Sequence, residues 1–234
     1  MSNFRLLFRA IKCKISEIKE DGLRDSFDLS KEKSRYLFRQ LIHPIDSYND
    51  LKYENKASVQ LSLIVVVAFF LIRLLDQTLT AYLFQTSEPS NVNLFERLLT
   101  SIGLILIWSV CNWATCTLAN GEGSFKIIWI ITAYSLIPYC ICTFISIGTS
   151  YFLTQNELVF YTTIRGFGLI WTLVLLFLGM LVAHQYTVLK TIVSVVLTLI
   201  MILLCCFLVV VIFSITQQIQ GFVLDVFKEL VTQK

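Results

Sequence analysis

Residues 191–215 read TIVSVVLTLIMILLCCFLVVVIFSI, a run without one charged side chain. A helix needs about 20 predominantly apolar residues to cross the roughly 30 Å hydrocarbon core of a bilayer. The run therefore predicts a transmembrane helix. Four further apolar runs of comparable length precede it in the chain: 59–84, 97–118, 127–152 and 160–182. We expect an all-α integral membrane protein with a bundle of five transmembrane helices.

The composition of the whole chain agrees with a membrane location. Of its 234 residues, 56% are hydrophobic and 15% are charged, whereas soluble domains average about 45–50% apolar residues. Residues 1–56 nevertheless hold 12 of the 19 Lys and Arg and 9 of the 16 Asp and Glu. The sequence thus excludes a wholly water-soluble protein and predicts three units: a polar N-terminal segment 1–56, a membrane domain 57–217 and a C-terminal tail 218–234.

Basic residues indicate the orientation of the spans. The early Lys and Arg residues, Lys126 and Lys190 all fall on one side, whereas the connections 85–93 and 153–159 on the other side hold none. Excess Lys and Arg marks cytoplasmic segments. Because five spans place the two termini on opposite sides, we expect a multi-pass plasma-membrane protein with a cytoplasmic N-terminus and an external C-terminus.

Amphipathic patterns occur at both ends of the chain. Within residues 1–20, apolar side chains recur at three- and four-residue steps between basic ones, which predicts a basic amphipathic helix. Such a helix either lies on an anionic leaflet or packs on the inner face of the protein itself. A second amphipathic pattern, over residues 219–231, predicts a helix on the outer surface after the fifth span.

Three charged residues within the spans are candidate functional residues, because charges inside a bilayer are costly. Arg73 and Asp76 lie three residues apart on one helix face, where they either pair with each other or face an ion or substrate site in the bundle. Arg165 lies one or two turns inside the fourth span. It either anchors the span by reaching the interface or belongs to the same site.

The third span and the loop before it hold the remaining candidates. Pro138 lies near the middle of the span, where it removes one backbone hydrogen bond and predicts a kink. The hydroxyls near it are expected to satisfy the freed carbonyl: Thr132, Tyr134, Ser135 and Tyr139. Such a kink either shapes a cavity or fits the helix into its bundle.

The loop Gly121-Glu122-Gly123 predicts a tight reversal between the second and third spans. It lacks the preceding strand and the spacing of a phosphate-binding loop, so a nucleotide site is not expected. Six of the seven cysteines lie in apolar runs, where cysteine behaves as a small hydrophobic residue. We expect no metal, no cofactor, no catalytic residue and no nucleic-acid partner.

Four segments together resemble the Yip (Ypt-interacting protein) domain family, and its bacterial branch most closely: His43–Tyr53, Asn112–Lys126, Thr132–Pro138 and Met180–Tyr186. The resemblance covers approximately residues 40–217. It implies a five-span helical membrane protein with a cytoplasmic N-terminus. Eukaryotic members of the family are associated with Rab-type GTPases and vesicle traffic. Gly121, Glu122, Gly123, Tyr134 and Pro138 are candidate functional residues because they lie in the matching segments.

Three functions remain open from the sequence. The leading hypothesis is a non-enzymatic scaffold or accessory subunit that binds another membrane protein, such as a transport complex. The alternative is a small transporter or channel, homo-oligomeric, that uses Arg73, Asp76 and Arg165. A third is membrane shaping by the two amphipathic segments. The lipid bilayer is an expected partner in all three.

Overall fold

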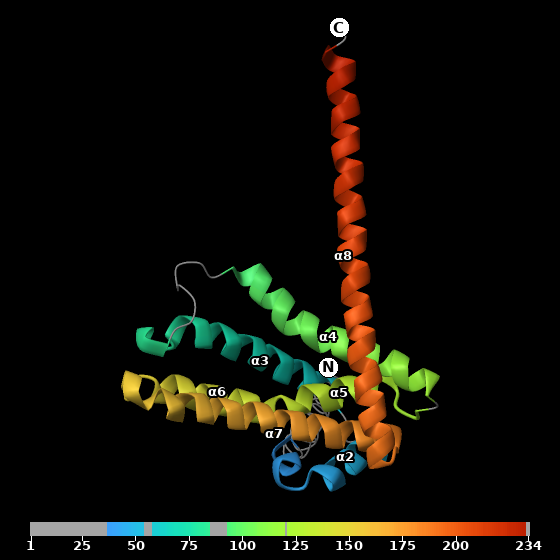
Figure 1. Ribbon diagram of the computed structural model, residues 1–234. Helices are drawn as coiled ribbons and strands as arrows, with labels where there is room; N and C mark the ends of the chain where they lie inside the picture. Colours follow the sequence, from blue (N-terminus) through green and yellow to red (C-terminus); the bar gives the residue numbers. More distant parts are fainter. Residues whose placement is uncertain (1–36, 54–57, 85–92, 120, 233–234) are drawn as a thin grey trace, which may run out of the picture.

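A computed structural model describes residues 37–53, 58–84, 93–119 and 121–232. These residues form helices without a strand (Figure 1). After the helical residues 37–42, the elements are α2 (Pro44–Tyr53), α3 (Val59–Leu79), α4 (Leu94–Leu118), α5 (Phe125–Ser135), α6 (Ile137–Thr149), α7 (Leu158–His184) and α8 (Val188–Thr232). Short 3-10 turns lie at Tyr82–Phe84 and Gln155–Glu157.

The described residues include five helical stretches that are long and apolar enough to cross a membrane. They are Val59–Leu79, Leu94–Leu118, Phe125–Thr149, Gln155–His184 and Val188–Phe222. The prediction of an all-α bundle with five membrane-spanning helices is therefore confirmed. The first span is shorter than the predicted run 59–84, because the α-helix ends at Leu79 and the chain bends into a 3-10 turn.

Local capping explains where two of the spans begin and where a third ends. The side chains of Ser58 and Asn93 accept hydrogen bonds from backbone N–H groups in the first turns of α3 and α4. At the end of α7, Gln185 adopts a left-handed conformation with φ 55° and ψ 39°. That residue reverses the chain between the last two spans, which the sequence separates by only a few polar residues.

The third span is broken, as Pro138 predicted. It consists of α5 and α6 with Leu136 between them. The carbonyl of Tyr134, four residues before the proline, accepts a hydrogen bond from Gln40 Nε2 at 2.7 Å. The expectation that nearby hydroxyls satisfy this carbonyl is wrong, because those of Thr132 and Ser135 bond carbonyls one turn back in their own helix.

The segment before the first span packs against one end of the bundle. We name this end the inner end and the opposite one the outer end, after the orientation that the basic residues predict. Tyr48 of α2 is fully buried, and its hydroxyl lies 3.0 Å from Ser135 Oγ. Gly179 of α7 allows this approach, since a Cβ at that position would lie 2.3 Å from Ile131 Cγ2 and 3.4 Å from the Tyr48 ring. Figure 1 shows α2 beneath α5 and α7. Burial raises the pKa of Tyr48, so its hydroxyl stays protonated.

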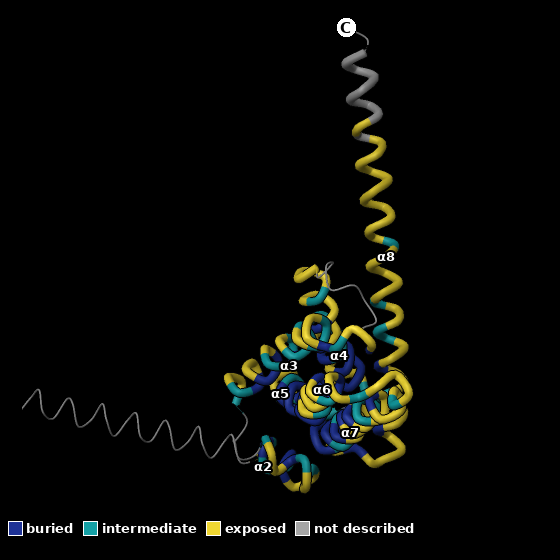
Figure 2. The backbone as a smooth tube through the Cα atoms, turned by 90° about the vertical axis from the view of Figure 1, so that its left-hand side faces the viewer, coloured by how far each residue is buried: buried dark blue, intermediate teal, exposed yellow. Residues whose placement is uncertain are grey.

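Helix α8 stands apart from the other spans (Figures 1 and 2). Only 6% of its most apolar window is buried inside the protein, against 61% for the third span. Near its beginning, Ser194 contacts Cys116 and Thr198 contacts Asn112 on α4. Cys205 Sγ lies 3.9 Å from Cys111 Sγ of α4, and from Cys206 to Phe222 most apolar side chains are exposed to the surroundings.

The same helix passes through the predicted boundary at 217/218. It continues to Thr232 as one element, so the tail expected as a separate surface helix is the extension of the fifth span. A lone Gly221 does not end it, which agrees with the tolerance of helices for single glycines. The basic amphipathic helix expected within residues 1–20 lies outside the described residues.

Replacing Gly179 with alanine is expected to destabilise the bundle by about 1–3 kcal/mol, because the added methyl group overlaps Ile131 in a filled core. Gly166→Ala is the matched control, since a Cβ at Gly166 meets nothing within 4 Å on the same helix. The control should keep or slightly raise stability. Thermal unfolding of both purified variants in detergent measures this, and equal midpoints would contradict the packing described for α2, α5 and α7.

Candidate functional site

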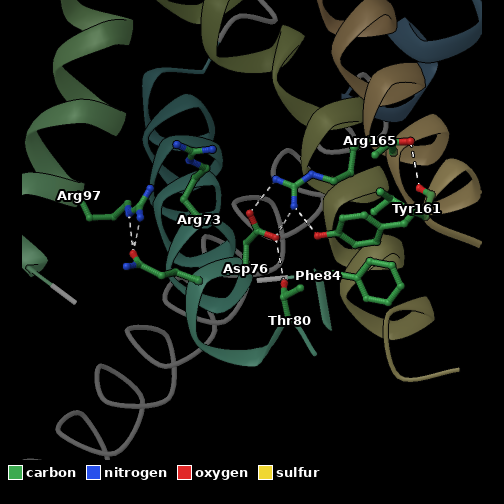
Figure 3. A pocket seen from close by; sticks show the side chains of 10 residues that line it. Arg73, Asp76, Thr80, Phe84, Arg97, Tyr161 and Arg165 are labelled. Carbon is green, nitrogen blue, oxygen red and sulfur yellow. Dashed lines mark hydrogen bonds and ion pairs between the residues drawn. The ribbon is translucent and has the colours of Figure 1, made fainter. Parts of the chain in front are cut away.

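A cavity of about 450 Å³ lies at the end of the bundle opposite α2. Residues of α3, α4 and α7 line it, together with the 3-10 turn after α3 (Figure 3). Its charged lining consists of Arg73, Asp76, Arg97 and Arg165. The three guanidinium groups and one carboxylate give this lining a formal charge of +2, so the cavity favours an anion.

Asp76 of α3 pairs with Arg165 of α7. Arg165 donates from NH1 to Oδ1 and from NH2 to Oδ2, both at 2.8 Å. The side chains are 29% exposed for Arg165 and 13% exposed for Asp76. Two parallel hydrogen bonds strengthen the ion pair and fix the relative orientation of the two side chains. The predicted pairing of Asp76 with Arg73 is therefore corrected, because the planar guanidinium on the neighbouring helix engages both oxygens of the carboxylate.

Two hydroxyls complete this ion pair. Tyr161, one turn before Arg165, accepts a hydrogen bond from Arg165 NH1 at 2.6 Å. Thr80 donates to Asp76 Oδ1 at 3.2 Å. Figure 3 shows both contacts converging on the pair from α7 and from the end of α3. The pair is thus held by side chains of both helices and ties α3 to α7.

The other two arginines bond neutral oxygens. Arg73 NH1 donates to the Tyr139 hydroxyl at 3.0 Å. Arg97 Nε donates to Gln77 Oε1 at 2.9 Å, and Arg97 NH2 donates to the same oxygen. Arg97 was not among the candidates from the sequence. The sequence offered one signal for it: Arg97 lies at the start of the second span, on the same side of the bundle as the end of the first span.

The cavity is close to the ends of its helices. Arg73 lies six residues before the end of α3 and Arg165 seven residues after the start of α7. At 1.5 Å per residue, these positions are about 9 and 10 Å from the helix ends. Long arginine side chains at this depth reach the interfacial region of a bilayer.

The loop Gly121-Glu122-Gly123 lies at the opposite, inner end. Added Cβ atoms would lie 2.6 Å from the Tyr186 hydroxyl at Gly121 and 2.6 Å from His184 Cε1 at Gly123. The glycines therefore allow the loop to rest on the turn between α7 and α8. Glu122 forms an ion pair with Lys52 of α2 at 3.2 Å.

The side chains of His184 and Tyr186 pack against this loop and form polar contacts with α4 and its C-terminal end. The His184 ring stacks on Tyr186 and its Nε2 lies 3.1 Å from Asn112 Oδ1. Tyr186 donates to the carbonyl of Ala119 at 3.2 Å. Burial, and then the neighbouring Cys116, raises the pKa of Tyr186, so this hydroxyl remains a donor at neutral pH.

The sequence candidates therefore lie in three places. Arg73, Asp76 and Arg165 share the outer cavity. Gly121, Glu122 and Gly123 form the inner loop against His184 and Lys52. Tyr134 and Pro138 lie between these sites, at the break in the third span, where the Tyr134 hydroxyl donates to the Ser58 carbonyl at 3.5 Å. In the described part of the chain, no group of three His, Cys, Asp or Glu side chains is placed to hold a metal ion.

A family model described as the Yip1 domain matches residues 38–210. The match runs from the helical residues before α2 into α8, so it includes the inner loop, the break in the third span and the outer cavity. No curated protein and no solved structure matches the chain.

Removing one partner of the ion pair is expected to cost more stability than removing both. Asp76→Asn leaves the Arg165 guanidinium without its carboxylate in a partly apolar site, at a cost of about 3 kcal/mol. In Asp76→Asn/Arg165→Gln the remaining groups are neutral and the loss should be smaller. Thermal unfolding of the two single variants and the double variant measures the coupling, and additive losses would mean that the pair does not join α3 to α7.

Proposed function

We propose that this chain, which belongs to the Yip1 domain family, is a non-enzymatic scaffold or accessory subunit of a membrane complex. The five apolar helices make it a multi-pass membrane protein. In the proposed arrangement it lies in the plasma membrane with residues 1–56 in the cytoplasm. That segment is the surface which a membrane-protein partner binds, for example a subunit of a transport complex.

The observation that carries this proposal is the docking of residues 37–53 on the inner end of the bundle. Gln40 and Tyr48 are fully buried, and both bond the third span next to its break. Lys52 adds an ion pair to the inner loop through Glu122. A partner bound to the polar N-terminal segment would therefore be held at a defined position relative to the spans.

The packing of the spans also favours a scaffold. The third span is the most enclosed of the five, and its buried side chains belong to the main hydrophobic cluster together with Tyr48 and Met180. A conduit needs a polar path along the bundle, whereas the buried hydroxyls of Thr132, Ser135 and Ser146 in this span each bond a carbonyl of their own helix.

The alternative is a small homo-oligomeric transporter or channel that uses Arg73, Asp76 and Arg165. The observation in its favour is the polar cavity that these residues line. Arg165 neutralises Asp76, and the third span is closely packed. A solute path would therefore have to run between copies of the chain.

Crosslinking in intact cells followed by mass spectrometry tests the scaffold function. The full chain should recover one membrane-protein partner reproducibly, and a chain that lacks residues 1–36 should lose it, because the deletion removes nine Lys and Arg but keeps the docked residues 37–53. Arg73→Gln, at the opposite end of the bundle, is the control and should retain the partner.

Two outcomes would contradict the scaffold function. One is the absence of any partner from the full chain and the variants alike. The other is solute flux in liposomes that contain the purified protein, with loss of the flux on Arg73→Gln, which would establish the transporter alternative.

A further inference from the structure

The described residues that line the outer cavity carry three guanidinium groups and one carboxylate. Among the described residues, Arg165 has the Asp76 carboxylate, but Arg73 and Arg97 donate only to the uncharged oxygens of Tyr139 and Gln77. A guanidinium carries five N–H donors in one plane. Most of these donors on Arg73 and Arg97 have no acceptor among the described residues.

We propose that this cavity binds a phosphate-bearing anion, held by Arg73 and Arg97. The planar fork of a guanidinium matches two oxygens of a phosphate, and such charge-assisted hydrogen bonds are short and strong. Asp76 does not oppose the anion, because Arg165 occupies both of its oxygens. Arg165 is thus a positioning residue, which leaves the other two arginines to provide the net positive charge.

The lining of the cavity suits the headgroup of a phospholipid. Its volume of about 450 Å³ falls in the range of roughly 300–1,000 Å³ that is usual for small-molecule sites. Phe84 and Leu158 supply an apolar side, while the arginines with Thr80 and Thr162 supply a polar one. A ligand with an anionic phosphate next to an apolar glycerol ester fits both sides.

The depth of the arginines agrees with such a ligand. Arg97 lies in the first turn of α4, and Arg73 lies about 9 Å from the end of α3. From these positions the long arginine side chains reach the boundary between headgroups and hydrocarbon. A lipid in the surrounding leaflet can therefore present its phosphate to the cavity without leaving the membrane. A soluble phosphate ion would enter by the same outer end.

Native mass spectrometry of the full chain with added lipids tests the site. Phosphatidylglycerol should bind more tightly than phosphatidylcholine with the same acyl chains, because choline neutralises its own phosphate. Arg73→Gln/Arg97→Gln should weaken phosphatidylglycerol binding about tenfold or more. Lys126→Gln/Lys190→Gln removes the same charge at the inner end and should leave binding unchanged.

A parallel titration with inorganic phosphate separates the two sources of the ligand. Absence of competition with phosphatidylglycerol supports the lipid headgroup, whereas direct binding of inorganic phosphate to the wild type that is lost in Arg73→Gln/Arg97→Gln supports the phosphate site with a soluble ion as its ligand. If that variant does not fold, Arg73→Lys/Arg97→Lys, which keeps the charge but loses the fork, should bind phosphatidylglycerol more weakly than the wild type. Equal binding of the two lipids, or undiminished phosphatidylglycerol binding by these arginine variants, overturns the proposal.

Discussion

The hydrogen bond from Gln40 to the carbonyl of Tyr134 is the contact on which the arrangement of this protein depends. Pro138 has no backbone N–H, so the carbonyl four residues earlier loses its helical partner. In a bilayer an unsatisfied backbone group is costly, and the break is tolerated only where another group replaces the missing donor. Here the replacement comes from the segment before the first span, which is thereby drawn into the bundle.

On the α6 side of the break, a backbone N–H group finds its acceptor in another helix. The N–H of Tyr139 donates to Thr172 Oγ1 of α7 at 3.1 Å. Tyr48 reaches Ser135 beside the break, and Gly179 makes room for its ring. The contacts at this break thus join α2, α5, α6 and α7 at one point. The inner loop and the outer cavity are then held at the two ends of this packed unit.

Hydropathy was sufficient to predict the five spans, and the position of Pro138 to predict the break in the third. They did not predict the partners across the bundle, because those join residues far apart in the chain. Arg73 and Asp76 are neighbours by helical spacing, yet Asp76 binds Arg165, which is 89 positions away. Gln40 was not recognised because its acceptor lies 94 positions away and the nearby hydroxyls offered a local solution. The exposure of α8 likewise depends on packing, since its apolar sequence matches that of an enclosed span equally well.

A double-mutant cycle between Gln40 and Pro138 tests the central contact most directly. Pro138→Ala restores the backbone N–H, so the Tyr134 carbonyl can bond within its own helix. Gln40→Leu should cost about 1–3 kcal/mol of unfolding free energy in the wild type and clearly less in the Pro138→Ala background. The measurement is the unfolding free energy, in detergent, of the purified wild type, the two single variants and the double variant. Equal losses in the two backgrounds would contradict the claim that the freed carbonyl holds the N-terminal segment against the bundle.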